Sequence, residues 1–512
     1  MQEEINQEKL DYSLKLIVKS SVFVFIGILL SKILTYVYRI LISKFGPEVY
    51  GIFSLSIIVL LWFGVFFSFG LYDGILRFIS FYRGKNEINK IRYVFRTSII
   101  FLFISGIVSG ILLYLFSNFI AINILHSPDL VVFLQIISLS IPFYTLSFGL
   151  LAVIQAYERV KAHSIISDVL RNLVNVVTLG IFIFLGFKTN AVILSYLLGI
   201  LALFLLSYFY CRHAIPEIFV KPKVSYRLKK VIRKDVFRYS LPFIFSGIIY
   251  EIFVNLDSFV IGYFKGATDV GYYNVAILLA SFLAIAPTLF TKLFFPLITK
   301  EFSLKNFGSI KILSKQVEKW VLIINLPLCL LIILFPGAVI NLLFGSEYIA
   351  AEISLRILGI GMFFYSLTTV LENLISMIGK SKVLMTNIFI AAVLNLVLNV
   401  LLVPRYGMAG AAFSTMLMYF ILGIILFFQV KNYTKIIPFK KDMLKICVSI
   451  IPPTILLFFL RNLIPVNLLS IILQVLFFIL TYLLLVFITK GIDRNDLMIL
   501  KAIKKKIFRN NK

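Results

Sequence analysis

Long apolar segments constrain this chain more than any other feature. A helix needs roughly 20 apolar residues to cross the hydrocarbon core of a bilayer, and the sequence holds fourteen segments of suitable length. Their approximate limits are 16–42, 48–80, 93–116, 130–156, 162–186, 190–211, 237–264, 272–299, 317–344, 353–378, 382–403, 408–430, 442–460 and 467–489. We therefore predict an all-α, polytopic membrane protein with about 14 transmembrane helices. The second segment is long enough that its end could instead be an interfacial helix.

The positions of the basic residues test this count independently. Lys and Arg total 50 and exceed Asp and Glu by 27, and positive residues favour cytoplasmic loops. With fourteen spans, 37 of the 50 fall on one side of the membrane and 5 on the other. The prediction is a multi-pass protein of the cytoplasmic membrane with both termini in the cytoplasm. The basic residues are spread over eight short connections, which favours anionic lipid headgroups over nucleic acid as their partners.

The chain also shows signs of an internal repeat. The longest basic connection follows the sixth span, and the outer loops 45–54 and 264–274 each place a Gly-aromatic pattern at the start of the next helix. Two six-helix halves with the same orientation imply a pseudo-two-fold axis along the membrane normal, with a substrate site between the halves. The predicted parts are an N-terminal lobe (1–211), a basic cytoplasmic linker (212–236), a C-terminal lobe (237–430), two further spans (431–489) and a basic cytoplasmic tail (490–512).

Three stretches resemble a known group of proteins. They are Ser31-Lys32-Ile33-Leu34 through Ser43-Lys44-Phe45-Gly46-Pro47-Glu48-Val49-Tyr50-Gly51, Gly379-Lys380-Ser381-Lys382, and Asn395-Leu396-Val397-Leu398-Asn399 through Val403-Pro404-Arg405-Tyr406-Gly407-Met408-Ala409-Gly410-Ala411-Ala412. The chain resembles polysaccharide or oligosaccharide flippases of the multidrug/oligosaccharidyl-lipid/polysaccharide (MOP) exporter superfamily. The resemblance implies movement of lipid-linked oligosaccharides to the outer leaflet for surface glycan assembly, with polysaccharide-assembly enzymes as partners.

Basic side chains inside the predicted spans are candidate substrate ligands, because a lipid-linked sugar carries phosphate and arginine binds phosphate oxygens bidentately. The candidates are Lys32, Arg39, Arg77, Arg171, Lys292 and Arg356. Lys32 and Arg39 are seven apart, on one face of the first helix. In the related peptidoglycan-precursor flippases, basic residues of this helix line the cavity; Lys32 matches that pattern and Arg39 is shifted from it by one position. Snorkelling to the interface is the alternative for both.

Acidic side chains inside spans are candidate sites for a coupling ion. Asp73 lies four residues before Arg77, and Asp168 lies three before Arg171, so each acid could form an ion pair within its own helix. Alternatively, each acid releases its arginine partner during transport and binds a proton or Na⁺ in its place.

Glu251 and Asp257 are the stronger coupling candidates. They share one span with Asn255 between them, and no basic residue lies nearby in that helix. The alternative is that they pair with Lys292 or Arg356 from other helices.

No cofactor, metal site or catalytic arrangement is predicted. The three cysteines are far apart, the three histidines form no ligand cluster, and the phosphate-binding motif GxxxxGK[ST] is absent. We therefore expect a transporter and not an enzyme. It needs no cofactor, and a coupling Na⁺ or H⁺ is the one ion we expect it to bind. An ion-coupled multidrug or small-molecule antiporter is the first alternative. A membrane glycosyltransferase or polymerase is the second, and the short outer connections disfavour it.

Overall fold

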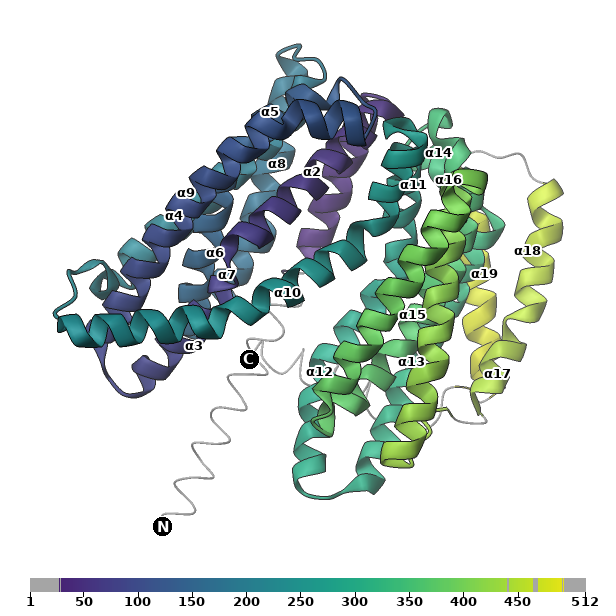
Figure 1. Ribbon diagram of the computed structural model, residues 1–512. Coiled ribbons are helices and arrows are strands. Elements are labelled where there is room, and N and C mark those ends of the chain that lie inside the picture. The colour runs from purple at the N-terminus through teal and green to yellow at the C-terminus, as the bar shows by residue number, and fades with distance from the viewer. Residues whose placement is uncertain (1–26, 28, 440–441, 464–467, 490, 492–512) are drawn as a thin grey trace, which may run out of the picture. The chain divides into compact units, whose positions relative to one another are not determined.

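A computed structural model describes residues 27, 29–439, 442–463, 468–489 and 491 (Figure 1). All regular elements of these residues are helices, which confirms the all-α prediction. The chain forms two compact units, residues 1–274 and 275–512. These units are defined by contacts within the fold, and the predicted division into six-span lobes stays a prediction.

The first described helix of unit 1, called the first helix below, covers residues 29–43. The unit continues through α2 (Pro47–Ser68), α3 (Leu71–Gly84), α4 (Ile88–Asn118), α5 (Leu130–Ser138), α6 (Ile141–Ala156), α7 (Val160–Ser164), α8 (Arg171–Phe184), α9 (Asn190–Ala214), α10 (Tyr226–Lys265) and the start of α11 (Ala267–Ala280). Two π-helical turns interrupt this series, η1 (Phe119–Ile124) and η2 (Ile165–Leu170).

Unit 2 contains the rest of α11 and the remaining helices. These are α12 (Ile285–Ser303), α13 (Phe307–Leu334), α14 (Pro336–Leu343), α15 (Glu352–Met377), α16 (Ser381–Thr434), α17 (Asp442–Ser449), α18 (Ile451–Leu463) and α19 (Leu468–Ile488). Short 3₁₀ turns lie at Ser281–Ala284 and Ser346–Ala351.

The described residues contain nine helices that are long and apolar enough to cross a membrane, or ten if α5 and α6 form one span bent by 48°. Two shorter apolar helices lie near the C-terminus. One of the nine is α16, whose 54 residues include a non-helical Gly407 (φ 57°, ψ −139°). This break divides α16 into the two predicted spans 382–403 and 408–430. The fourteen-span prediction is compatible with this pattern.

The predicted second span, 48–80, is two helices. Phe69 (φ 52°) and Gly70 (φ 63°) are consecutive left-handed residues that end α2 and start α3. A Cβ atom on Gly70 would lie 2.3 Å from the carbonyl oxygen of Ser240, so the position has room for glycine alone. The interior break is therefore built into the backbone.

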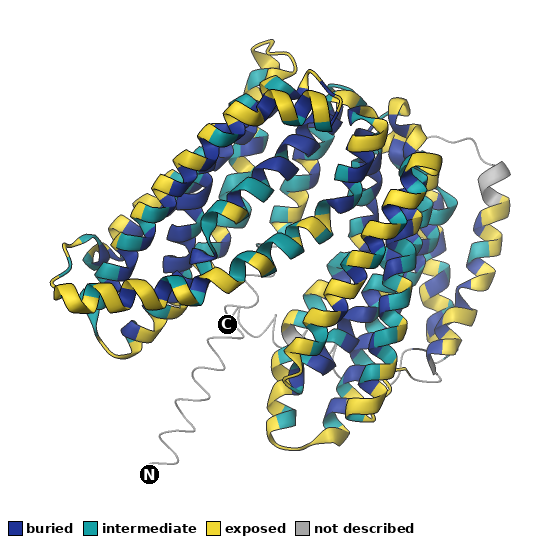
Figure 2. Ribbon diagram, in the orientation of Figure 1, coloured by how far each residue is buried: buried dark blue, intermediate teal, exposed yellow. Residues whose placement is uncertain are grey.

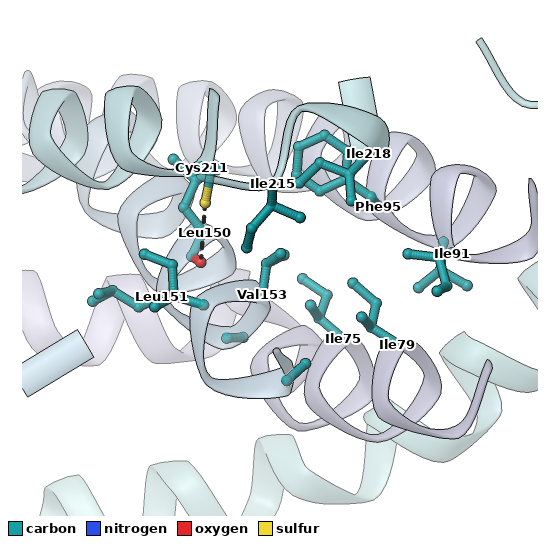
Figure 3. Packing of buried hydrophobic residues seen from close by; sticks show 14 of the residues in the cluster. Ile75, Ile79, Ile91, Phe95, Leu150, Leu151, Val153, Cys211, Ile215 and Ile218 are labelled. Atoms are coloured by element: carbon teal, nitrogen blue, oxygen red, sulfur yellow. Dashed lines mark hydrogen bonds between the residues drawn. The ribbon is translucent and has the colours of Figure 1, made fainter. Parts of the chain in front are cut away.

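A compact apolar core holds α3, α4, α6 and α9 of unit 1 together (Figure 3). Ile75 and Ile79 of α3 and Val153 of α6 are fully buried in it. Cys211 of α9 lies in the same core, 3.8 Å from the carbonyl oxygen of Leu150, as the dashed line shows. In a bilayer the lipid is as apolar as these side chains, so close packing rather than removal from water stabilises the cluster.

Large apolar side chains also face outward. Figure 2 shows exposed positions along much of α4, where Ile104, Ile111 and Leu115 are all more than half exposed. An outward apolar face is expected where the neighbour is a lipid chain. The structure thus describes a multi-pass membrane protein.

The two loops that suggested a repeat meet in unit 1 through a pair of glycines. A Cβ atom on Gly51 would lie 1.7 Å from the carbonyl oxygen of Ala267, and one on Gly271 would lie 1.9 Å from that of Pro47. Gly51 lies four residues after Pro47, and Gly271 lies four residues after Ala267, so the two contacts mirror each other. Reciprocal close contact of this kind is typical of small residues at membrane helix crossings. Here it joins the two loops that carry the predicted repeat pattern, and the repeat itself stays a prediction.

Candidate functional site

Two guanidinium groups and three aromatic rings form one cluster in unit 1, which we call the cationic–aromatic cluster: Arg39, Tyr50, Phe53, Arg171 and Tyr196. The Arg39 guanidinium lies 5.2 Å from the centre of the Phe53 ring and 5.5 Å from that of Tyr50. Phe53 meets Tyr196 edge-on at 5.6 Å between ring centres. Arg171 lies 5.3 Å from the Tyr196 ring centre and donates from Nη2 to its hydroxyl at 2.8 Å.

The surrounding packing fixes these rings. Tyr38 contacts Phe53 edge-on at 5.9 Å, and its hydroxyl lies 2.9 Å from Ser195 Oγ on α9. Arg39 Nη1 donates to Ser54 Oγ at 3.2 Å. The first helix, α2, α8 and α9 therefore all position the cluster, and two adjacent residues of the first helix, Tyr38 and Arg39, contribute to it.

Neither arginine of the cluster forms an ion pair with a described acid, and both are half-buried. The Nε of Arg171 is buried and has no hydrogen-bond partner among the described residues. Cation–π contact offsets part of the desolvation of a guanidinium, by about 0.5–2 kcal/mol, but leaves its charge uncompensated. The cluster can therefore accept an anion with several oxygens.

The ion pair that sequence spacing allowed between Asp168 and Arg171 is not formed. The Asp168 carboxylate instead accepts from Ser164 Oγ at 2.7 Å and from Ser167 Oγ at 2.9 Å. Asp168 lies in the π-helical turn η2, and Arg171 begins α8 directly after it. A π turn holds more residues than an α turn, so the two side chains leave the helix in different directions.

The second spacing-based ion pair, between Asp73 and Arg77, is also not formed among the described residues. Arg77 is exposed, and its guanidinium lies 4.0 Å from the ring centre of Tyr239 on α10. Asp73 is half-buried in the first turn of α3, where a carboxylate is favoured by the helix N-terminus. The aromatic contact holds the arginine away from its predicted partner.

The two coupling candidates of α10 each have a polar neighbour. Asn255 Nδ2 donates to Glu251 Oε2 at 3.0 Å, one turn along the same helix. The Tyr273 hydroxyl of α11 donates to Asp257 Oδ2 at 2.6 Å. Both acids are half-buried, so each combines a carboxylate with a fixed donor. Ion coupling at Glu251 and Asp257 stays a prediction.

The remaining basic candidates lie in different environments. Lys32 and Lys292 are exposed side chains of their helices. Arg356 forms an ion pair with Glu352 one turn earlier in α15, with Nη2 and Oε1 2.5 Å apart. Of the six predicted basic ligands, only Arg39 and Arg171 therefore belong to the cationic–aromatic cluster.

Sequence reasoning missed Glu318. The predicted span 317–344 places Glu318 at its very start, whereas α13 begins at Phe307 and carries Glu318 about three turns into the helix. Glu318 is 0% exposed, and neither carboxylate oxygen has a hydrogen-bond partner among the described residues. Ser314 and Asn325, both buried, lie on the same face at helical spacing. This stripe of polar residues on one face of an otherwise apolar helix is the sequence signal that would have identified Glu318.

Apolar helices long enough to span a membrane define a polytopic membrane protein, and ionisable side chains within such spans are candidates for its function. Residues 17–302 match the family described as polysaccharide biosynthesis protein, and residues 242–401 match the MatE family. Because the first match covers more than half of the chain, the protein belongs to the polysaccharide biosynthesis protein family. The prediction of membership in the MOP exporter superfamily is thereby confirmed.

Individual relatives agree with this assignment. The "Uncharacterized membrane protein MJ1068" of Methanocaldococcus jannaschii is 28% identical over 443 residues, 81% of this chain and 84% of that protein. The "Putative O-antigen transporter" of Shigella flexneri is 25% identical over 377 residues, 72% of this chain and 86% of that protein. Among solved structures, lipid II flippase MurJ in an inward closed conformation has the same fold, with a TM-score of 0.68 at 19% identity over 91% of this chain and 98% of that one.

Proposed function

We propose that this protein is a flippase that moves a lipid-linked oligosaccharide, carried on a polyprenyl phosphate or diphosphate, across the cytoplasmic membrane by alternating access. The product would feed the assembly of a surface polysaccharide or glycan, and the assembling enzymes are the expected partners. The termini are proposed to lie in the cytoplasm, since the basic residues concentrate on that side.

The observation that carries the proposal is the cationic–aromatic cluster. A phosphate or diphosphate headgroup offers several anionic oxygens, and a guanidinium binds such oxygens through a planar pair of N–H donors. Arg171 forms no ion pair with a described acid, and Arg39 Nη1 donates to the neutral hydroxyl of Ser54. The buried rings of Tyr50, Phe53 and Tyr196 hold both guanidinium groups in place beside one another.

The names of the relatives support the same class of substrate. The Shigella flexneri relative is named for O-antigen transport, and MurJ for the flipping of lipid II. Both names describe a sugar-containing cargo that crosses a membrane. The proposal extends that class to this chain and leaves the particular sugar open.

An ion-coupled multidrug antiporter is the second candidate, favoured by the match of residues 242–401 to the MatE family. The matched stretch includes Glu251 and Asp257, which we propose as the site of a coupling Na⁺ or H⁺ in either case. Asp73 and Asp168 are proposed as further coupling residues. Arg39 and Arg171, which form no ion pair with a described acid, favour an anionic cargo over a cationic drug.

Reconstituted vesicles separate the two candidates. A fluorescent polyprenyl-diphosphate oligosaccharide is placed in one leaflet, and its appearance in the other is followed with and without protein. We expect translocation that falls at least tenfold in Arg39→Ala and Arg171→Ala. Arg212→Ala is the matched control, because Arg212 also stacks on an aromatic ring, that of Phe219 at 5.3 Å, outside the cluster.

Two results would count against the flippase. One is the absence of protein-dependent lipid translocation together with ion-driven efflux of a cationic dye, which would favour the antiporter. The other is an equal loss of translocation in Arg212→Ala, which would show that the arginines act only through folding.

A further inference from the structure

Unit 2 contains an apolar groove that the proposed function does not use. It has a volume of about 410 Å³ and lies between α15 and the second part of α16. Five phenylalanines and one tyrosine contribute to its walls, among them Phe364, Phe420, Phe427 and Phe428. It is open to the surface, where Phe420, Ile424 and Phe428 are 42%, 43% and 55% exposed.

The two helices that form the groove run in the same direction. Phe364 and Phe420 are 5.0 Å apart between ring centres, and Tyr365 and Tyr419 are 5.1 Å apart. Gly423 lines the wall of the groove without a side chain. A Cβ atom there would lie 3.4 Å from Thr368 Cγ2, so a larger residue would fit the backbone and fill the groove.

The exposed side of the groove continues into basic residues. Along α16, Phe420, Ile424, Phe428 and Lys431 follow one another at intervals of three or four residues, which places them on one face. Lys435 directly follows the last residue of this helix. Phe420 and Lys431 are separated by about 16 Å along the helix axis at 1.5 Å per residue. This is close to half of the roughly 30 Å hydrocarbon core. This face is therefore about as long as one leaflet is thick, with an apolar part at the depth of the lipid chains and a basic end at the depth of the headgroups.

Two further lysines lie at the same end of unit 2. Lys380 and Lys382 stand at the start of α16, and Lys380 Nζ lies 4.0 Å from the ring centre of Tyr433 near the end of that helix. All of Lys380, Lys382, Lys431 and Lys435 are exposed. Within the described residues, none of them forms an ion pair with an acid. Four such cations beside an apolar groove complement an anionic headgroup attached to a hydrocarbon chain.

We propose that this groove binds one anionic phospholipid, with a hydrocarbon chain between α15 and α16 and the headgroup phosphate on Lys431 and Lys435. The groove extends over residues 419–428 of α16, about 14 Å, so its mean cross-section is about 30 Å². The groove is long and narrow, as a lipid chain requires, and the lysines at its end favour an anionic headgroup. The site is independent of the proposed function, since it needs no sugar-bearing substrate.

Native mass spectrometry of the full chain in detergent tests the site. Phosphatidylglycerol and phosphatidylcholine with the same chains are titrated separately into delipidated protein. We expect phosphatidylglycerol to bind at one saturable site at least tenfold more tightly. Lys431→Gln with Lys435→Gln should weaken it about 30-fold, because each lysine beside an anionic lipid contributes about a factor of five.

Gly423→Leu tests the apolar half of the site. It should abolish binding of phosphatidylglycerol by filling the groove, while the gain in helix propensity over glycine keeps the fold. Lys311→Gln, an exposed lysine of α13, is the matched control and should bind like the wild type. Thermal unfolding of each variant shows that it is folded.

Three results would overturn the proposal. Equal binding of the two phospholipids would remove the role of the lysines. Unchanged binding in folded Gly423→Leu would remove the role of the groove. Displacement of phosphatidylglycerol by tenfold less polyprenyl phosphate would identify a carrier lipid as the occupant instead.

Discussion

Replacement of Gly51 by alanine should destabilise the protein through a backbone clash. The new Cβ atom would lie 1.7 Å from the carbonyl oxygen of Ala267, whereas real Cβ atoms keep at least about 3 Å. The starts of α2 and α11 would have to separate by more than about 1 Å, and neither backbone can relieve the overlap by a rotamer change. Overpacking costs about 1–3 kcal/mol or more, and the alanine recovers up to about 1 kcal/mol of helix propensity. The expected net loss is about 2 kcal/mol.

Thermal unfolding in detergent, followed by circular dichroism, measures this loss. Gly180→Ala is the matched control, because Gly180 lies inside α8 with no atom within 4 Å of its added Cβ. The control should gain about 0.5–1 kcal/mol, so the two substitutions differ in sign. Gly271→Ala should resemble Gly51→Ala, and the double variant should lose less than the sum, since one helix separation relieves both clashes. A Gly51→Ala protein as stable as Gly180→Ala would refute the close crossing.

Three further substitutions test single contacts. Tyr196→Phe removes the hydroxyl that accepts from Arg171 Nη2. It should lower the free energy of unfolding by about 1–3 kcal/mol and slow lipid translocation. A thermal midpoint equal to that of the wild type would contradict the contact. Tyr273→Phe removes the donor to Asp257 and should raise several-fold the Na⁺ or H⁺ concentration that gives half-maximal transport, and an unshifted dependence would argue against coupling there. Glu318→Met removes a buried carboxylate without described partners and should stabilise the fold by about 1–3 kcal/mol; a loss of stability in thermal unfolding would show that the carboxylate is satisfied.

Hydropathy and charge predicted the fold class well, because every segment that crosses lipid must be apolar and must satisfy its own backbone hydrogen bonds. The break at Gly407 in α16 falls where the predicted spans 382–403 and 408–430 are separated. The division of the second span was harder to foresee, because the left-handed Phe69 carries no propensity signal and depends on the close approach of Ser240 to Gly70.

The candidate site was predicted less completely than the fold. Arg39 and Arg171 were singled out because cations at membrane depth are costly. Their joint cluster was not foreseen, since it depends on Phe53 and Tyr196 meeting across helices. The spacing of Asp168 and Arg171 would allow an ion pair in a regular α-helix. The π turn η2 separates the two side chains, and the sequence does not reveal that turn. Hydropathy patterns give the number and type of helices, while side-chain partners depend on local backbone geometry and on packing between helices.

Translocation of a fluorescent polyprenyl-diphosphate oligosaccharide in reconstituted vesicles, compared between wild type and Arg171→Gln, tests the central claim most directly. Glutamine keeps a polar side chain but removes the charge and the planar fork that binds phosphate. The account predicts protein-dependent translocation by the wild type and at least a tenfold slower rate for the folded variant. Equal rates would contradict the assignment of the cationic–aromatic cluster to the path of the headgroup.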